Sequence, residues 1–494
     1  MLINPFSLVS PPLFMAADIH AIDRQWAESH PNVPLMEKAG AAAAELAGTL
    51  ASDTGEPILI LVGPGNNGGD ALVAARLLMT QGFRVDVASR TDPSRLPRDA
   101  ALAWAAYREG GGGILPDISA RQRYSLLIDG LFGVGLDRAV EGEDARWIKQ
   151  ANGFPCPKLA LDVPSGLDSD SGQIRGTAIR ADHTLTYLGL KPGLFTADGP
   201  DQAGQLHLDM LGLDPIAMVY LQGRGRGCKD AKASTTTLSM QGVALTQLES
   251  RHQLPARRKN SHKGMYGHVG IIGAAPGMVG AGLIAGRAAL QQGAGLVTLG
   301  TLDERIVVDF VEPRLMFATP EMLVDARLDV LVIGPGLGQS TRAHYLLKIA
   351  LATPCPLVLD ADALNLLAKH PELADLAARR SHPTVFTPHP GEAARLLGVT
   401  DVEVQAGRIQ AARHLSRHYH AYVALKGTGT VIAHPDDRYA INTSGGPWLA
   451  QAGSGDRLTG MVAALLAQGL EAGNALEAAV WLHGSAAVIS KCGF

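Results

Sequence analysis

The sequence predicts two α/β domains, each built on a doubly wound parallel sheet. A chain of 494 residues is too long for one ordinary hydrophobic core. Short runs rich in Val, Leu and Ile alternate with Ala- and Leu-rich stretches of helical character, which is typical of parallel sheets with helices on both faces. The alternation stops once, in a small and polar stretch, and then resumes.

The N-terminal half begins with two helical patterns and continues with strand-like runs. The helical patterns cover 16–28 and 33–47. The strand-like runs cover 58–63, 83–89, 125–129, 158–162 and 183–189. Helical stretches separate most of these runs, so we expect a Rossmann-like domain over residues 1–222.

A polar, aperiodic segment follows and predicts a linker at 223–244, because it is rich in Gly, Arg, Ser and Thr. The second domain is expected over 245–494. Its strand-like runs cover 268–273, 296–301, 330–336, 356–362, 384–390 and 422–433. The last run is expected to fold as a hairpin that turns at Gly427–Gly429.

Composition excludes several classes of protein. Hydrophobic residues make up 46% and charged residues 18%, and the formal net charge of −4 implies no general affinity for nucleic acid or an anionic membrane. Four cysteines form no C-x-x-C pair, which argues against a cysteine zinc site or a disulfide framework. No signal peptide and no apolar run of about 18 residues is evident, so we expect a cytoplasmic protein.

The segment 58–70, I-L-I-L-V-G-P-G-N-N-G-G-D, matches the dinucleotide fingerprint G-x-G-x-x-G. Such a loop directs backbone N–H groups and a helix N-terminus at a phosphate. Two features argue against an ordinary dehydrogenase. The second strand ends in Ser89 and Arg90 where an acidic residue should bind the ribose. The loop also carries Asn66, Asn67 and Asp70, which phosphate binding does not need; a plain tight turn stays open as an alternative.

Two carboxylates follow apolar runs in the same half. Asp129 ends S-L-L-I-D and Asp162 ends K-L-A-L-D, and each precedes a glycine-containing loop. The carboxyl ends of parallel strands face the ligand crevice, so both should approach Asn67 there. Each aspartate alone could equally be a turn residue or a helix cap.

At these residues the chain resembles the YjeF N-terminal domain, the NAD(P)HX epimerase. The resemblance rests on G-P-G-N-N-G-G-D, L-I-D-G-L-F-G-V-G-L-D-R and L-D-V-P-S-G-L-D. It implies that the substrate is a nicotinamide nucleotide hydrated at C6, that Asp162 is the acid/base residue, and that a potassium ion binds through Asn67, Asp129 and Ser165. It further implies that the substrate NADHX or NADPHX contacts Asn66, Asn67, Gly68, Gly69, Asp70, Gly133, Val134, Gly135, Leu136, Asp137, Arg138, Ala139 and Asp162.

The second half carries four glycine-rich or polar motifs, at 334–338, 387–392, 425–430 and 452–460. The last, A-G-S-G-D-R-L-T-G, precedes an apolar helical run, so its amides should form an anion site beside Asp456. Asp456 could there accept a proton from a hydroxyl that attacks a phosphoryl group. Taken singly, Asp456 could be a helix cap, His389 a loop histidine and Lys426 a solvated strand end.

This set resembles the ADP/ATP-dependent NAD(P)HX dehydratase of the ribokinase-like superfamily. Residues 358–368 and 387–398 match that family closely. The resemblance implies Asp456 as the base and Mg²⁺ with ADP or ATP as co-substrate. It implies that the hydrated nucleotide contacts Ala281, Gly338, His389 and Asp456, and that the adenine nucleotide contacts Lys426, Gly427, Thr428, Gly429, Thr430 and Gly455.

The chain departs from the dehydratase pattern at 444–451, S-G-G-P-W-L-A-Q, and at Arg457, where an aliphatic residue is usual. Both halves together predict a bifunctional NAD(P)H-hydrate repair enzyme. Its expected partners are small-molecule substrates and further copies of itself in a homo-oligomer. Two alternatives stay open: a ribokinase-type small-molecule kinase fused to a nucleotide-binding domain, and a first domain that only binds or scaffolds. The choice between ADP and ATP and between NADHX and NADPHX is not fixed by the sequence.

Overall fold

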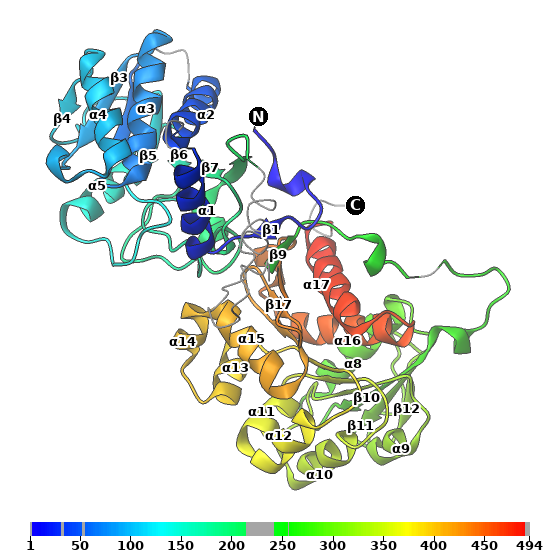
Figure 1. The fold of residues 1–494 in the computed structure, drawn as a ribbon. Coiled ribbons are helices and arrows are strands. Elements are labelled where there is room, and N and C mark those ends of the chain that lie inside the picture. Colours follow the sequence, from blue (N-terminus) through cyan, green and yellow to red (C-terminus); the bar gives the residue numbers. More distant parts are fainter. Residues whose placement is uncertain (1, 31–33, 52–54, 214–241, 255, 490–494) are drawn as a thin grey trace, which may run out of the picture. The chain divides into compact units, whose positions relative to one another are not determined.

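The computed structural model describes residues 2–30, 34–51, 55–213, 242–254 and 256–489 (Figure 1). The chain divides into two compact units, Met1–Met240 and Gln241–Phe494. The predicted linker at 223–244 lies outside the described residues except at its end, where 242–244 belong to strand β9, Gly242–Leu245. Within the described ranges, no helix is both long and apolar enough to cross a membrane.

The N-terminal unit contains a sheet in which every neighbouring pair of strands is parallel, which confirms the predicted α/β class. The strand order is β4-β3-β2-β5-β6-β7-β8. The strands are β2 Ile58–Val62, β3 Val85–Ser89, β4 Ile114–Leu115, β5 Leu126–Gly130, β6 Lys158–Leu161, β7 His183–Tyr187 and β8 Gln205–Asp209, and β1 Pro12–Leu13 precedes them. The outer strands β4 and β8 are additions to the five predicted ones.

Helices cover both faces of this sheet because the side chains of each strand alternate. Ile58, Ile60 and Val62 pack into a core with α1 to α4, whereas Leu59 and Leu61 pack on the other face with α5. The helices are α1 Ala16–Ser29, α2 Leu35–Leu50, α3 Asn66–Thr80, α4 Arg98–Glu109, α5 Gly142–Asn152 and α6 Gly199–Ala203, with short 3₁₀ turns at Pro5–Ser7, Pro93–Arg95 and Pro192–Leu194.

The C-terminal unit contains a larger, mixed sheet. Its strands run in the order β9-β18-β17-β16-β15-β14-β13-β10-β11-β12. They are β10 His268–Gly273, β11 Leu296–Thr301, β12 Met316–Ala318, β13 Val330–Ile333, β14 Leu357–Leu359, β15 Thr384–Phe386, β16 Tyr422–Leu425, β17 Val431–Ala433 and β18 Tyr439–Asn442. Strands β10 to β16 are all parallel to their neighbours in the sheet up to β16. The antiparallel pair β16–β17 confirms the predicted hairpin.

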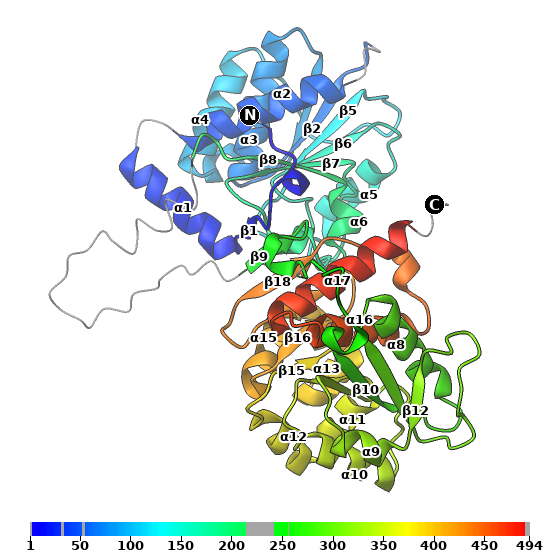
Figure 2. The same cartoon turned by 90° about the vertical axis from the view of Figure 1, so that its right-hand side faces the viewer.

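Helices surround this sheet as well (Figure 2). Helices α8, α16 and α17 share a core with Val269 and Ile271, while α10 to α13 and α15 contact one another. The helices are α8 Val279–Gln291, α9 Pro320–Asp325, α10 Thr341–Ala350, α11 Asp362–Lys369, α12 Pro371–Ala378, α13 Pro390–Leu397, α14 Asp401–Ala406, α15 Arg408–Tyr419, α16 Ser454–Ala467 and α17 Ala472–Ile489, with 3₁₀ turns at Ser250–His252, Lys263–Tyr266 and Pro447–Leu449.

Candidate active sites

The glycines of the fingerprint loop have two different roles. A Cβ atom at Gly63 would lie 1.7 Å from the carbonyl oxygen of Leu131, and one at Gly68 would lie 2.1 Å from the carbonyl oxygen of Gly63. A Cβ atom at Gly65, just before α3, would meet nothing within 4 Å. Gly63 therefore permits the chain after β2 to approach the chain after β5, and Gly68 permits α3 to approach the end of β2. Of the three glycines, only Gly65 faces open space.

That open space is a cavity of about 460 Å³, a volume suited to a small-molecule ligand. The predicted residues that line it are Asn66, Asn67, Asp70, Gly133, Val134, Gly135, Leu136, Asp137, Arg138 and Asp162. Gly68, Gly69 and Ala139 are not among the lining residues. A Cβ atom at Gly69 would lie 2.5 Å from the side chain of Met36, so Gly69 serves helix packing.

Asp162 projects from the end of β6 with a left-handed backbone, φ 65°. The fully buried ammonium of Lys191 donates to Asp162 Oδ1 at 2.5 Å, to Thr186 Oγ1 at 2.8 Å and to the carbonyl oxygen of Tyr187 at 2.8 Å. Burial lowers the pKa of Lys191, and the charge of Asp162 opposes that change. Sequence reasoning missed Lys191, because nothing in the strand pattern pairs it with an aspartate 29 residues earlier.

A second acidic group lies in the same cavity. Burial and the charges of Asp162 and Asp23 raise the pKa of Asp70 well above its usual range. Burial and the charges of Asp70 and Asp162 likewise raise the pKa of Tyr187. Burial therefore disfavours the charged forms of both Asp70 and Tyr187. The buried Tyr187 hydroxyl has no hydrogen-bond partner among the described residues.

The three residues expected to bind potassium lie around the ends of β5 and β6. Ser165 donates from Oγ to Asp129 Oδ1 at 2.6 Å and from its backbone N–H to Asp129 Oδ2 at 2.8 Å. Burial raises the pKa of Asp129 to about 6. Within the described chain, Asn67 is buried with both side-chain polar atoms unpaired. An unpaired buried amide oxygen, a carboxylate and a hydroxyl are the kinds of ligand that fit a hard cation.

Asn67 and Asp162 both approach Gly133 in the cavity. A Cβ atom at Gly133 would lie 3.2 Å from Asp162 Oδ2 and 3.4 Å from Asn67 Cγ. The structure therefore brings the loop after β5, the start of α3 and the end of β6 together, as the strand-end argument predicts.

The C-terminal unit has its own polar centre, built around Asp360 at the end of β14. Its buried carboxylate accepts from Lys426 Nζ at 2.9 Å and from Thr459 Oγ1 at 2.8 Å. Burial alone would raise the pKa of Asp360, but the charge of Lys426 holds it below the usual range. Burial and the charge of Asp360 raise the pKa of Glu392 to about 7, although Lys426 opposes this.

Asp456 lies in the first turn of α16, next to this centre. Burial and the charge of Asp360 raise the pKa of Asp456 to about 6. A Cβ atom at Gly455 would lie 3.1 Å from Lys426 Nζ, so the lysine ammonium approaches the N-terminus of α16. Free amides of a helix start and a lysine ammonium together form a binding site for phosphate groups.

The remaining predicted residues surround the same strand ends. His389 caps α13 and accepts at Nδ1 from the N–H of Gly391 at 3.0 Å. Gly338 donates its N–H to Asp362 Oδ2 at 2.8 Å. Ala281 is reached from the same loop, since a Cβ atom at Gly336 would lie 3.3 Å from Ala281 Cβ.

Arg408, a residue that sequence reasoning missed, holds the start of the turn at 426–430 through hydrogen bonds. The buried guanidinium of Arg408 donates to the carbonyl oxygens of Leu425 and Lys426 at 3.2 and 3.3 Å. Burial lowers the pKa of Arg408 to about 10. Gly427 has φ 138°, and a Cβ atom there would lie 2.7 Å from the guanidinium.

Asp360 was also missed, although it ends the apolar run 356–360 as Asp129 and Asp162 end theirs. Between Asp360 and Asp362, Ala361 adopts φ 49° and ψ −117°, a conformation usually reserved for glycine. This bend directs Asp360 toward Lys426 and Asp362 toward Gly338.

The departures from the dehydratase pattern lie close to the start of α16. Trp448 is 44% exposed in the 3₁₀ turn Pro447–Leu449. Burial, with the charges of Arg457 and Lys426, lowers the pKa of His483 to about 4. Arg457 therefore adds positive charge near His483 in the first turns of α16.

Comparison with known proteins accounts for both units. A model of the family described as YjeF-related protein N-terminus matches residues 32–193, and a model described as NAD(P)H-hydrate dehydratase matches residues 269–491. The bifunctional NAD(P)H-hydrate repair enzyme of Escherichia coli (strain K12) is 38% identical over 93% of this chain and 85% of its own length. This chain belongs to the family of bifunctional NAD(P)H-hydrate repair enzymes.

Other members of this repair family match over a similar span. The enzyme of Moorella thermoacetica is 36% identical over 96% of this chain and 91% of its own length. A solved structure of the ADP/ATP-dependent NAD(P)H-hydrate dehydratase from Bacillus subtilis, co-crystallized with ATP/Mg²⁺, is 34% identical, covers 49% of this chain and 87% of its own, and has a TM-score of 0.43. The family resemblance read from the sequence motifs is thus confirmed.

Proposed function

We propose that the N-terminal unit interconverts the R and S epimers of hydrated NADH and NADPH, and that the C-terminal unit dehydrates the S epimer. The observation that carries this division is the presence of two polar centres, one around Asp162 and one around Asp456, each inside its own unit. Family membership supports the pairing of the two activities.

For the epimerase, Asp162 is the group that moves a proton near C6 of the ring. Lys191 holds Asp162 in position and balances its charge. The segments Asn66–Asp70 and Gly133–Ala139 hold the nucleotide. Asn67, Asp129 and Ser165 would bind K⁺, which would supply a fixed positive charge beside the substrate.

For the dehydratase, Asp456 takes the proton of the 6-hydroxyl as its oxygen attacks the terminal phosphoryl group of ADP or ATP. The amides at the start of α16 and Lys426 stabilise the negative charge that develops. The C6–O bond then breaks and phosphate leaves, and the neighbouring ring carbon C5 loses a proton to solvent, so that the ring double bond is restored. In this proposal Ala281, Gly338 and His389 contact the hydrated nucleotide, Lys426–Thr430 and Gly455 contact the adenine nucleotide, and Mg²⁺ accompanies its phosphates.

The test is to assay Asp162→Asn and Asp456→Asn separately on a mixture of NADHX epimers with ADP or ATP. We expect Asp456→Asn to abolish NADH recovery while R and S still interconvert. We expect Asp162→Asn to recover NADH only from the S epimer. A folded Asp456→Asn variant that no longer epimerises would contradict the division between the units.

The same assay separates the alternative functions. Consumption of ATP with a vitamin-like alcohol, and none with NADHX, would favour a ribokinase-type kinase. If NADH is recovered from both epimers with only one of ADP and ATP, that nucleotide is the phosphoryl donor. The proposal also includes a cytoplasmic location, supported by the absence of C-x-x-C pairs from the sequence, and assembly as a homo-oligomer.

A further inference from the structure

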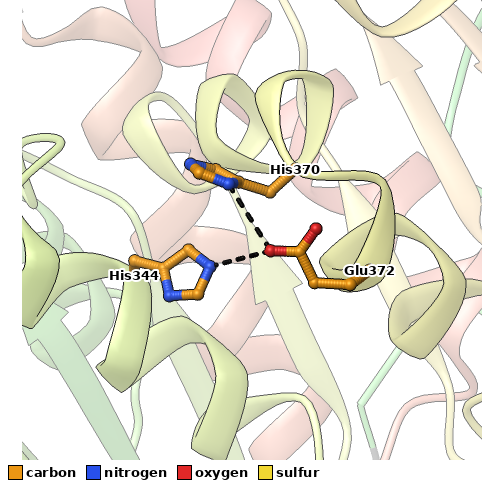
Figure 3. A group of neighbouring side chains, drawn as sticks. All are labelled: His344, His370 and Glu372. Carbon is orange, nitrogen blue, oxygen red and sulfur yellow. Dashed lines mark hydrogen bonds and ion pairs between the residues drawn. The ribbon is translucent and has the colours of Figure 1, made fainter.

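A cluster of two histidines and a glutamate lies in the C-terminal unit, outside both proposed active sites (Figure 3). His344 comes from α10, His370 lies between α11 and α12, and Glu372 is in the first turn of α12. The Asp456 mechanism uses none of these residues.

The ligand atoms of the cluster are already close together. His344 Nε2 lies 3.1 Å from Glu372 Oε1, and His370 Nδ1 lies 3.5 Å from the same oxygen. One ligand atom from each residue lies within 4.8 Å of the other two. Ligands about 2.0–2.2 Å from a tetrahedral zinc ion are roughly 3.3–3.5 Å apart, so the two short distances match those of a zinc site.

Packing and hydrogen bonds hold the backbone that carries these side chains. Helix α10 is anchored by the buried side chains of Leu346 and Leu347. The corner between α11 and α12 is closed by Leu373 N–H, which donates to the carbonyl oxygen of His370 at 3.0 Å. Ligands held on rigid elements bind a metal with little loss of conformational entropy.

We propose that His344, His370 and Glu372 form a binding site for Zn²⁺ or a similar divalent transition metal, which joins α10 to the corner between α11 and α12. Two imidazoles and one carboxylate select such ions over Mg²⁺, which prefers oxygen ligands alone. The three side chains are 29%, 39% and 58% exposed, so the ion can enter from solvent and keep water at a fourth position. This proposal does not depend on the proposed catalytic functions, because none of the three side chains takes part in them.

Binding of this ion should stabilise a segment that reaches the dehydratase site. Helix α11 begins at Asp362, which accepts the N–H of Gly338, and ends one residue before His370. An ion at His370 would therefore fix the far end of the helix whose first residue supports the predicted substrate loop. We expect Zn²⁺ to raise the thermal stability of the C-terminal unit.

The experiment uses the full-length protein after treatment with a chelator. Co²⁺ replaces Zn²⁺ as a visible probe, and its absorption bands are followed during titration with excess Mg²⁺ present. We expect one equivalent of Co²⁺ to give the strong bands of a four-coordinate site. We expect His344→Gln, His370→Gln and Glu372→Gln each to weaken Co²⁺ binding more than roughly tenfold. Loss of a direct ligand should cost at least as much affinity as loss of a residue that only orients a ligand.

A matched control is available on α15. His414 and His418 are four residues apart, with ring centroids 6.5 Å apart, and among the described residues they belong to no group of three metal-ligating side chains. His418→Gln should leave the Co²⁺ spectrum and the Zn²⁺-dependent rise in melting temperature unchanged. Unchanged binding in the three cluster variants, or no Co²⁺ binding to the wild-type protein, would overturn the proposal and leave a simple histidine–glutamate ion pair. Retained NADH recovery shows that each variant is folded.

Discussion

At the scale of single residues, each unit pairs a lysine with a buried carboxylate at a strand end. Lys191 binds Asp162 in the first unit, and Lys426 binds Asp360 in the second. Burial of either charge alone would cost several kcal/mol, so the two members of each pair depend on each other. In the second unit, this arrangement holds Lys426 beside the start of α16, where phosphate groups are expected to bind.

The pKa of Asp456 predicts the acid limb of the dehydratase profile. Burial and the charge of Asp360 raise this pKa to about 6. In the proposed mechanism Asp456 is the base and must be ionised, and its protonated fraction grows as the pH falls through about 6. We expect kcat/KM for dehydration to fall about tenfold for each pH unit below that value. Initial rates of NADH formation between pH 5 and about 8 would measure it; a rate that stays level down to pH 5 would rule Asp456 out as the base.

At the scale of secondary-structure elements, the fingerprint loop offers a comparison between two glycines. Gly68→Ala places a methyl group 2.1 Å from a backbone oxygen, so we expect a loss of about 2 kcal/mol or more in the free energy of unfolding. Gly65→Ala has open space and an ordinary φ of −111°, so its stability should change by less than about 0.5 kcal/mol.

The variant that keeps its stability, Gly65→Ala, is the one expected to lose substrate affinity. Gly65 lines the cavity, so Gly65→Ala should raise KM for the hydrated nucleotide in a fully stable protein. Urea unfolding and epimerase kinetics measure the two effects. Equal stability of both variants would show that the close approach of strand β2 and helix α3 is not required.

Helix α17 is tied to the start of the C-terminal unit through Glu477. Its carboxylate accepts from His252 Nε2 at 2.7 Å and from His434 Nε2 at 2.8 Å, and Arg251 lies 3.0 Å away. Burial alone would raise the pKa of Glu477, but these hydrogen bonds and charges lower it to about 2. A depressed pKa stabilises the folded state above the unfolded-state value and loses that effect as the pH falls toward about 2.

We therefore expect Glu477→Gln to lose about 3 kcal/mol of unfolding free energy at neutral pH, and the deficit should shrink as the pH drops below about 4. Asp436→Asn, which breaks an exposed pair with Arg438, is the control and should cost less than about 1 kcal/mol. Chemical unfolding at several pH values measures both. A deficit that does not depend on pH would assign the effect to packing.

At the scale of the whole molecule, each unit has its own hydrophobic core and its own polar centre. We expect a fragment of residues 1–240 to epimerise NADHX and to produce no NADH with ADP or ATP. Chromatographic separation of the two epimers measures the first activity. A folded but inactive fragment would show that the first unit needs the second, and would revive a purely binding role for it.

The parallel strands and strand-end aspartates could be predicted from the sequence because both leave local patterns. Strands β4, β8, β9, β12 and β18 could not, since they are short and their sequences lack a long apolar run. Lys191 and Arg408 were missed for another reason. Their roles depend on partners brought near by folding, and a lone basic residue after a strand or at a helix start is usually solvated.

Ala361 shows how function restricts the changes that this chain can accept. A glycine would adopt φ 49° and ψ −117° without strain, whereas a side chain there costs about 1–3 kcal/mol. Selection for heat resistance would therefore favour Ala361→Gly and reject any β-branched residue at that position. The same glycine would loosen the angle between Asp360 and Asp362. At Ala361, the side chain that lowers the free energy of unfolding is thus the one that keeps Asp360 and Asp362 in place.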